Sequence, residues 1–273
     1  MSKFPHLKMR NFIPLQPELE MNTDYYIEFK EKNFLDQSTI LFYQFRINED
    51  LGSSISVIPD GCIDILFACN VQQPFANVYG SVLHRKAINF QTTQEYFGVR
   101  LLPKKEQKLN HSMKDIIEQE VPLTEIISVD DTVIEKIANE KDFYGRIRLF
   151  KEMIGSTLFT YDSSSNLVRY ALNKIYSSKG NVNINQLAVE TGYSTRYLRK
   201  QFEECVGISP KLFSQIVRFQ HSLHMLMKQN HYTIWDVVNE NGYYDQAHLI
   251  NEFKKFGYLT PGKVLGTLSQ KIV

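Results

Sequence analysis

The chain has 273 residues, of which 43% are hydrophobic and 22% charged, a composition that excludes an intrinsically disordered protein. Its 31 basic and 30 acidic residues give a net charge of +1, which taken alone disfavours a nucleic-acid-binding protein. The three cysteines form no Cys-x-x-Cys pair, so a disulfide scaffold and a zinc ribbon are excluded and free thiols in a reducing compartment are expected.

The first part of the sequence predicts β-strands. Runs rich in β-branched and aromatic residues occupy Ile40–Ile47, Ser54–Cys69 and Tyr96–Leu102, and turn-forming residues bound each of them. Pro59-Asp60-Gly61 interrupts the second run and predicts a tight turn. From about Pro122 the apolar spacing changes to three- and four-residue steps, which predicts two helices before Leu158.

A short Ser-rich segment, 162–166, separates two parts of opposite charge. The part before Asn166 has 18 basic and 23 acidic residues, a net −5, and the part from Asn166 onward has 13 and 7, a net +6. The near-zero total is therefore a cancellation, and the basic surplus points to nucleic-acid binding by the second part. Apolar spacing predicts helices throughout that part, including a long one around Ser209–Gln229.

The second part contains an internal repeat. Leu187–Pro210 and Val237–Pro261 resemble one another, with Gly192-Tyr193 matching Gly242-Tyr243, Phe202 matching Phe253, and Pro210 matching Pro261. In each copy an apolar helix runs to a glycine that can end it in a left-handed conformation. A second helix then begins at a capping residue, Ser194 or Asp245. Each copy therefore predicts a helix-turn-helix unit, whose second helix suits a major groove.

On these residues the sequence resembles the AraC/XylS family of bacterial transcription regulators, whose DNA-binding domain has two helix-turn-helix units joined by a linker helix. The residues that carry the resemblance are Leu187-Ala188, Gly192-Tyr193-Ser194, Tyr197-Leu198, Phe202, Gly207–Pro210, Phe213, Gly242-Tyr243, Asp245-Gln246, Phe253–Lys255 and Thr260-Pro261. Two departures from the family pattern are the early position of Gly257 and Asn251 in place of a basic residue. The segments PDGCIDILF, YGSV and YFGVRLLP resemble the β-rich N-terminal domain of one branch of the family.

The resemblance implies an α+β protein with a β-rich, cupin-like or barrel-like regulatory domain at 1–120 and a helical segment at 121–161 that dimerises or packs within the chain. A linker at 162–166 and an all-α DNA-binding domain at 167–268 would follow. It also implies double-stranded DNA and RNA polymerase as partners, a small-molecule effector, a homodimer, and activation more often than repression. Neither an apolar leader nor a run of about 18 apolar residues occurs, so we expect a cytoplasmic, nucleoid-associated protein without membrane contact or cofactor.

The family motif assigns candidate DNA contacts in both units. In the first it points to Ser194, Thr195, Arg196, Arg199 and Lys200, with Tyr197, Leu198 and Phe202 on the inner face. In the second it points to Gln246, His248 and Asn251, with Tyr244 and Asp245 at the helix entrance. Arginine suits guanine, and Gln and Asn suit adenine or phosphate. The candidates for phosphate contacts are Lys211, Lys254, Lys255 and Lys263. An ordinary solvated basic face is the alternative interpretation of these positions.

The residues that suggest other chemistry are isolated. His221 and His224 lie three residues apart on a predicted helix without an acidic or cysteine partner at ligand spacing, so a packing role is favoured over a metal site. Asp60, Cys62, Asp64 and His84 form no catalytic motif, and no enzyme is expected. Three alternatives remain: a DNA-tethered enzyme, a repressor, and a ligand-independent regulator whose first domain binds a protein. An apolar pocket of about 300 Å³ or more in that domain would favour a ligand sensor.

Overall fold

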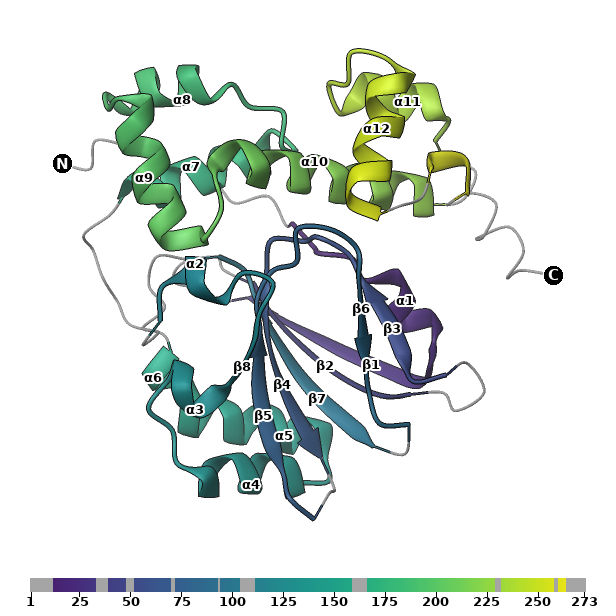
Figure 1. Ribbon diagram of the computed structural model, residues 1–273, viewed down its shortest axis with the longest axis vertical. Helices are drawn as coiled ribbons and strands as arrows, with labels where there is room; N and C mark the ends of the chain where they lie inside the picture. The colour runs from purple at the N-terminus through teal and green to yellow at the C-terminus, as the bar shows by residue number, and fades with distance from the viewer. Residues whose placement is uncertain are drawn as a thin grey trace.

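The computed structural model describes residues 12–32, 39–47, 52–69, 72–92, 94–103, 111–158, 166–228, 232–257 and 260–263. Figure 1 shows a β-rich N-terminal domain with the helices of the C-terminal domain lying along one end of its sheet. Residues 162–165 of the predicted linker, and the predicted DNA-binding domain beyond residue 263, lie outside the described residues.

An antiparallel six-stranded sheet forms the centre of the N-terminal domain. Its order is β1 (Thr23–Lys32), β2 (Thr39–Ile47), β7 (Glu95–Leu101), β4 (Ile63–Cys69), β5 (Phe75–Tyr79) and β8 (Glu120–Pro122). β3 (Ser54–Val57) pairs with β6 (Lys86–Asn89) in a separate two-stranded sheet. The predicted run Ser54–Cys69 is therefore two strands of different sheets, because the turn at Pro59-Asp60-Gly61 carries the chain from one to the other. The predicted β-rich domain is confirmed. In the described part of the large sheet, β1 and β8 are the two edge strands and do not pair with each other.

Helices cover one face of the large sheet, as Figure 1 shows. They are α3 (Leu123–Ile126), α4 (Asp131–Asn139), α5 (Phe143–Phe150), a π-helical turn (Lys151–Gly155) and α6 (Ser156–Leu158). Their apolar side chains form one buried cluster with Phe42, Phe67 and Phe97 of the sheet. Packing within the chain therefore accounts for the apolar face of the predicted helical segment, and its exposed face remains the predicted dimerisation surface.

The opposite face of the sheet lies against β3, β6 and the short helix α1 (Pro17–Met21). Leu19, Phe45, Ile55 and Phe90 are among the residues of a second buried cluster there. β4 and β7 are neighbours in the large sheet, and their register places Asp64 directly opposite Arg100. Two charged residues on apolar strands thus meet on the face that β3 and β6 cover.

In the described residues the C-terminal domain contains six labelled helices, and a further helical turn lies at residues 261–263. The six helices are α7 (Asn166–Ser177), α8 (Ile184–Thr191), α9 (Thr195–Val206), α10 (Pro210–Met227), α11 (Ile234–Glu240) and α12 (Gln246–Gly257). The fully buried phenylalanines Phe202, Phe213, Phe219 and Phe253 pack in one core that extends along α10. The predicted long helix is confirmed as α10, and no described helix is both long and apolar enough to cross a membrane.

Candidate nucleic-acid interface

α8 and α9 form the first helix-turn-helix unit. The Asn183 side chain caps α8, which ends at Gly192 with φ +71°. Ser194 then caps α9 by accepting a hydrogen bond from the Tyr197 backbone N–H at 3.2 Å. Both the left-handed glycine and the serine cap agree with the sequence-based prediction. Because Leu198, Phe202 and Val206 are buried against the core, the opposite face of α9 points to solvent.

The side chains predicted to contact DNA from the first unit lie on this outward face. Thr195, Arg196, Arg199 and Lys200 are all exposed. Arg199 Nε lies 2.6 Å from Glu203 Oε1, and Lys200 Nζ lies 3.9 Å from Glu204 Oε1. Exposed ion pairs within one helix contribute little to stability, so phosphate or base oxygens can replace these carboxylates as partners.

The assignment of Tyr197 to the inner face is wrong. Its side chain is 44% exposed and stacks on the exposed ring of Tyr193, with ring centroids 5.0 Å apart. The inner row of α9 runs through Leu198 and Phe202 at four-residue spacing, which leaves Tyr197 at the border of that row. The stacked pair therefore adds an exposed aromatic surface beside the turn of the first unit.

α11 and α12 form the second unit. Thr233 and Asp236 make a reciprocal capping box at the start of α11, and Gly242 follows that helix with φ +69°. The Asp245 carboxylate accepts a hydrogen bond from the His248 backbone N–H at 2.7 Å, which confirms its predicted capping role. Trp235, the one tryptophan of the chain, is 63% exposed in the first turn of α11.

The predicted contact residues of the second unit differ in accessibility. Tyr244 is 93% exposed, and Asp245, Asn251, Lys254 and Lys255 are exposed as well. Gln246 is half-buried. The half-buried ring of His248 lies edge-on to Tyr243 at 5.2 Å and its Nε2 is 3.4 Å from Arg218 Nη2, so it contacts the protein interior.

A buried polar cluster fixes α12 to α10. Arg218 of α10 reaches Glu252 of α12 through two contacts, Nη2 to Oε2 at 2.5 Å and Nε to Oε1 at 3.0 Å. The Tyr243 hydroxyl donates to Glu252 Oε1 at 2.7 Å and accepts from Ser222 Oγ at 3.2 Å. Arg218 also lies over the Tyr243 ring, 4.6 Å from its centroid. Because Glu252 and Tyr243 are buried, the orientation of α12 depends on this cluster.

The histidines of α10, the helix that links the two units, have packing roles. His221 Nδ1 lies 2.7 Å from Asn241 Oδ1, so it joins α10 to the end of α11. Burial and the nearby Lys179 lower the pKa of His221. Burial and the nearby Lys228 lower the pKa of His224. The described residues include no cluster of three His, Cys, Asp or Glu side chains that could hold a metal ion.

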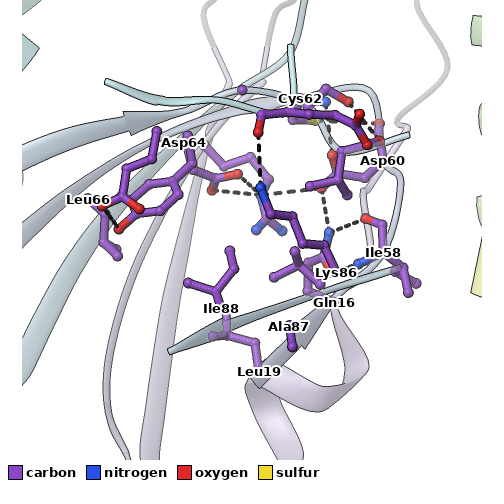
Figure 2. Close-up of a pocket in the computed structure, with 18 of the residues that line it drawn as sticks. Gln16, Leu19, Ile58, Asp60, Cys62, Asp64, Leu66, Lys86, Ala87 and Ile88 are labelled. Carbon is purple, nitrogen blue, oxygen red and sulfur yellow. Dashed lines mark hydrogen bonds and ion pairs between the residues drawn. The ribbon is translucent and has the colours of Figure 1, made fainter. Parts of the chain in front are cut away.

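A cavity of about 280 Å³ lies between the large sheet and the β3–β6 pair of the N-terminal domain. Figure 2 shows Asp60 and Asp64 along one side of it, with Ile88 and Leu19 along the other. Arg100 is 4% exposed, and its Nε lies 2.9 Å from Asp64 Oδ1 and 3.5 Å from Asp60 Oδ2.

The electrostatics of the cavity follow from burial and from its ion pairs. Burial raises the pKa of Asp64, although the Arg100 guanidinium opposes that shift. Burial alone would lower the pKa of Arg100, but the carboxylates of Asp64 and Asp60 raise it well above its usual value. Burial also raises the pKa of Cys62 well above its usual value, so its thiol is not an activated nucleophile.

Sequence reasoning noted Asp60 and Asp64 but missed Arg100, their partner. A signal was present, because Asp64 and Arg100 each lie between apolar residues within a strand, and charged residues are rarely buried unless they are paired. The cavity approaches the predicted volume, but its lining is more polar than the predicted apolar pocket.

Comparisons with known proteins agree with the geometry of the C-terminal domain. Residues 187–266 match the family model of a helix-turn-helix domain. A search of curated proteins finds no match.

Solved structures similar to the chain include the C-terminal domain of AraT, a response regulator from Geobacillus stearothermophilus, with 22% identity over 39% of this chain and 88% of that one and a TM-score of 0.36. A probable AraC family transcriptional regulator from Rhodopseudomonas palustris has 25% identity over 38% of this chain and 98% of that one, with a TM-score of 0.34. ToxT from Vibrio cholerae has 11% identity over 90% of this chain and 98% of its own, with a TM-score of 0.43. With its two units on a shared linker helix and its family match, the C-terminal part of the chain is an AraC-type helix-turn-helix domain.

Proposed function

We propose that the protein is a sequence-specific DNA-binding transcription regulator. α9 and α12, the reading helices, enter two major-groove segments on one face of the DNA, separated by about one helical turn of 34 Å. The observation that carries this proposal is the pair of helix-turn-helix units on one linker helix, each with a solvent-facing second helix. The surplus of basic residues in the same part of the chain supports it.

The two reading helices have different chemistry. Arg196 and Arg199 in α9 offer guanidinium groups that can bond guanine O6 and N7 together, so α9 supplies most of the base selectivity. In α12, Asn251 is the exposed amide, and Lys254 and Lys255 contact phosphates. Ser194, Thr195, Tyr244, Asp245 and Gln246, at the starts of the two helices, position them on the backbone, and Lys200, exposed on α9 with Arg196 and Arg199, is a further base-edge reader.

Selection of bound fragments from random-sequence DNA tests this proposal. The wild-type chain should enrich a defined site of two segments, whereas Arg196→Ala and Arg199→Ala should each lose selectivity at one base position. Arg148→Ala, which removes an exposed arginine of the N-terminal domain, is the matched control and should enrich the wild-type site. Absence of any enriched site, or full selectivity in both α9 variants, would show that the proposal is wrong.

The cavity supports the proposal that a small ligand controls this regulator. The family resemblance favours activation as the outcome and RNA polymerase as the partner. The cavity is close to the small end of the usual range for ligand pockets, about 300–1,000 Å³. Its lining has four carboxylates (Asp60, Asp64, Glu118 and Glu120) and two cationic side chains (Lys86 and Arg100). This acidic surplus favours a neutral or cationic ligand with hydroxyl or amine donors over an organic acid.

Thermal unfolding with a panel of small amines, polyols and organic acids of matched size tests the ligand proposal. A ligand of the cavity should raise Tm in the wild-type chain and lose that effect in Asp64→Asn. Stabilisation by acids alone, with no effect of the amines and polyols, would contradict the assignment. Absence of any stabilisation, together with recovery of a protein partner through the N-terminal domain, would support the protein-binding alternative.

A further inference from the structure

The wall of the cavity is also part of the contact between the two domains. The turn Pro59-Asp60-Gly61 follows β3 and precedes β4. Its middle residue, Asp60, lines the cavity, and the residues on either side of it touch the C-terminal domain. A single tight turn therefore has one surface toward the cavity and another toward the linker helix α10.

The cavity side of the turn is held by the Asp60 carboxylate. Its Oδ2 accepts a hydrogen bond from Gln16 Nε2 at 2.9 Å and lies 3.5 Å from Arg100 Nε. Its Oδ1 accepts from the Cys62 backbone N–H at 2.9 Å. Asp60 is 4% exposed, so a ligand that competes for these oxygens must rearrange the turn.

The opposite side of the turn is held by two residues of α10. The Pro59 carbonyl accepts a hydrogen bond from Gln220 Nε2 at 2.8 Å. Gly61 has φ +74°, and a Cβ built there would lie 2.5 Å from Cε2 of the buried Phe213 ring, so the backbone of the turn rests directly on that ring.

Gln220 belongs to the DNA-binding domain, but its side chain makes hydrogen bonds to the N-terminal domain. Besides the Pro59 carbonyl, Nε2 donates to the Leu15 carbonyl at 3.3 Å, and Oε1 accepts from the Leu15 N–H at 2.8 Å. Gln220 is 1% exposed, so these bonds have no ready replacement in water. Leu15 immediately precedes Gln16, which bonds to Asp60. Leu15, which bonds to Gln220, and Gln16, which bonds to Asp60, therefore form a second connection between α10 and the turn.

Two other segments of the cavity wall also meet the C-terminal domain. Glu118 follows α2 (Met113–Ile116), and the ion pair between Lys114 and Glu203 joins α2 to α9 at 3.4 Å. Val82 lies two residues before His84, whose Nδ1 is 3.0 Å from the Lys255 carbonyl at the end of α12. Residues of the cavity wall therefore lie only a few sequence positions from residues that contact the two reading helices.

We infer that occupancy of the cavity is transmitted to α10 through the Pro59-Asp60-Gly61 turn, with Asp60 as the group that senses the ligand and Gln220 as the group that receives the change. This inference rests on the proposed function. A ligand that hydrogen-bonds to the Asp60 carboxylate shifts the turn, which alters the Gln220 hydrogen bonds and the Phe213 contact. Since α10 carries both units, its displacement moves α9 and α12 relative to the N-terminal domain, which contacts them through the Lys114–Glu203 and His84–Lys255 pairs, and hence changes DNA affinity.

Amide hydrogen exchange, measured in the full chain without DNA, tests the coupling between the turn and Gln220 separately from DNA binding. Gln220→Leu should accelerate exchange of the Cys62 amide, whose acceptor is Asp60, because coupling between two sites is reciprocal. Ser222→Ala is the matched control. Ser222 is also buried on α10, but its partners, the Arg218 carbonyl and the Tyr243 hydroxyl, lie within the C-terminal domain. Equal exchange at Cys62 in wild type and Gln220→Leu overturns the inference, even if the chain binds DNA as proposed.

A double-mutant cycle on DNA affinity tests the consequence. Asp60→Asn should change the Kd for the selected DNA site about fivefold or more, and this change should largely disappear in the Gln220→Leu background. Ile88→Val, on the far side of the cavity, should act independently of Gln220→Leu. Additive effects of Asp60→Asn and Gln220→Leu, or an unchanged Kd in Asp60→Asn, overturn the inference. Failure to select any site would instead refute the proposed function and leave the exchange result to decide the coupling.

A pair of glycine variants covers the case in which Asp60→Asn fails to fold. Gly61→Ala and Gly52→Ala place alanine at φ +74° and φ +86°, so both carry a similar backbone cost. A Cβ at Gly52 has no atom within 4 Å, whereas one at Gly61 meets Phe213. Gly61→Ala should therefore change DNA affinity and Gly52→Ala should not. Equal effects of the two on Kd overturn the inference.

Discussion

Arg218 and Glu252 form a two-contact ion pair between the linker helix and the second reading helix, with the shorter contact at 2.5 Å. The Glu252 side chain is 4% exposed and that of Arg218 is 12% exposed, so both charges are largely removed from water. No equivalent ion pair between described residues joins α9 to α10, whose contact is made by apolar side chains such as Phe202 and Phe213. The two reading helices are thus attached to the same helix by different interactions.

Removal of one charged side chain of the Arg218–Glu252 pair should lower the free energy of unfolding. Glu252→Ala leaves the Arg218 guanidinium and the Tyr243 hydroxyl without their acceptor, and we expect a loss of about 3–5 kcal/mol in the free energy of unfolding. Urea unfolding followed by circular dichroism measures the effect. The double variant Arg218→Met/Glu252→Leu leaves no unpaired charge and should be more stable than Glu252→Ala. A double variant that is less stable than the single one would contradict this account.

The lysines of α12 should contribute to affinity but not to sequence selectivity. Lys254 and Lys255 are exposed, and each phosphate contact that is lost should reduce the slope of log K against log salt concentration by about 0.9. Titration of the selected DNA site at several salt concentrations measures the slope for Lys254→Ala and Lys255→Ala. Lys136→Ala, an exposed lysine on α4, is the control and should keep the wild-type slope. A Lys254→Ala variant with an unchanged slope but altered base preference would reassign that residue to base contact.

The hydroxyl of Ser194 should stabilise the first reading helix through its cap. Ser194→Ala removes the hydrogen bond to the Tyr197 N–H and should cost about 1 kcal/mol. Ser194→Asp keeps an acceptor at the cap and should retain stability, but its charge should weaken DNA binding at a helix end that faces phosphates. Thermal unfolding and DNA titration of the two variants separate these roles. Equal DNA affinities for wild type and Ser194→Asp would place this helix end away from the DNA backbone.

The stability of the chain should fall in mild acid because of His221. Burial lowers the pKa of this histidine below its ordinary value of 6.5, so the unfolded chain binds a proton more readily than the folded one. The contribution of the neutral ring is complete above about pH 6.5 and is lost as the pH falls through that value toward the folded pKa. Urea unfolding between about pH 8 and about pH 5 measures this loss.

His221→Gln is the informative variant for this pH dependence, because its amide can still reach Asn241 but does not titrate. Its unfolding free energy should vary less with pH than that of the wild-type chain. His224 has a lowered pKa as well and should account for part of the remaining dependence. An identical pH profile in wild type and His221→Gln would show that His221 does not titrate in this range.

The DNA-binding domain was predictable because its signals are local in the sequence. A left-handed glycine, a capping residue three positions before the backbone amide that donates to it, and an apolar residue every fourth position can each be recognised within about ten residues. Their repetition after fifty residues made the pattern specific. The error at Tyr197 arose at the border of the apolar row, where periodicity alone does not decide exposure.

The N-terminal domain was less predictable because its contacts connect residues far apart in the chain. β1 was missed since its charged residues, among them Glu28 and Lys30, obscure the apolar alternation of an edge strand. The cavity depends on the β4–β7 register, which brings Asp64 opposite Arg100 across 36 residues of sequence. Gln220 meets Pro59 across 161 residues, and no local pattern indicates such a contact.

Trp235 gives the protein an intrinsic optical probe of one half of its DNA-binding surface. As the one tryptophan in the chain, exposed at the start of α11, it makes indole fluorescence a signal of the second unit alone. Anisotropy of a labelled oligonucleotide reports capture by either unit. Rapid mixing with both detectors would therefore show whether the two units reach the DNA together or in succession, without modification of the protein.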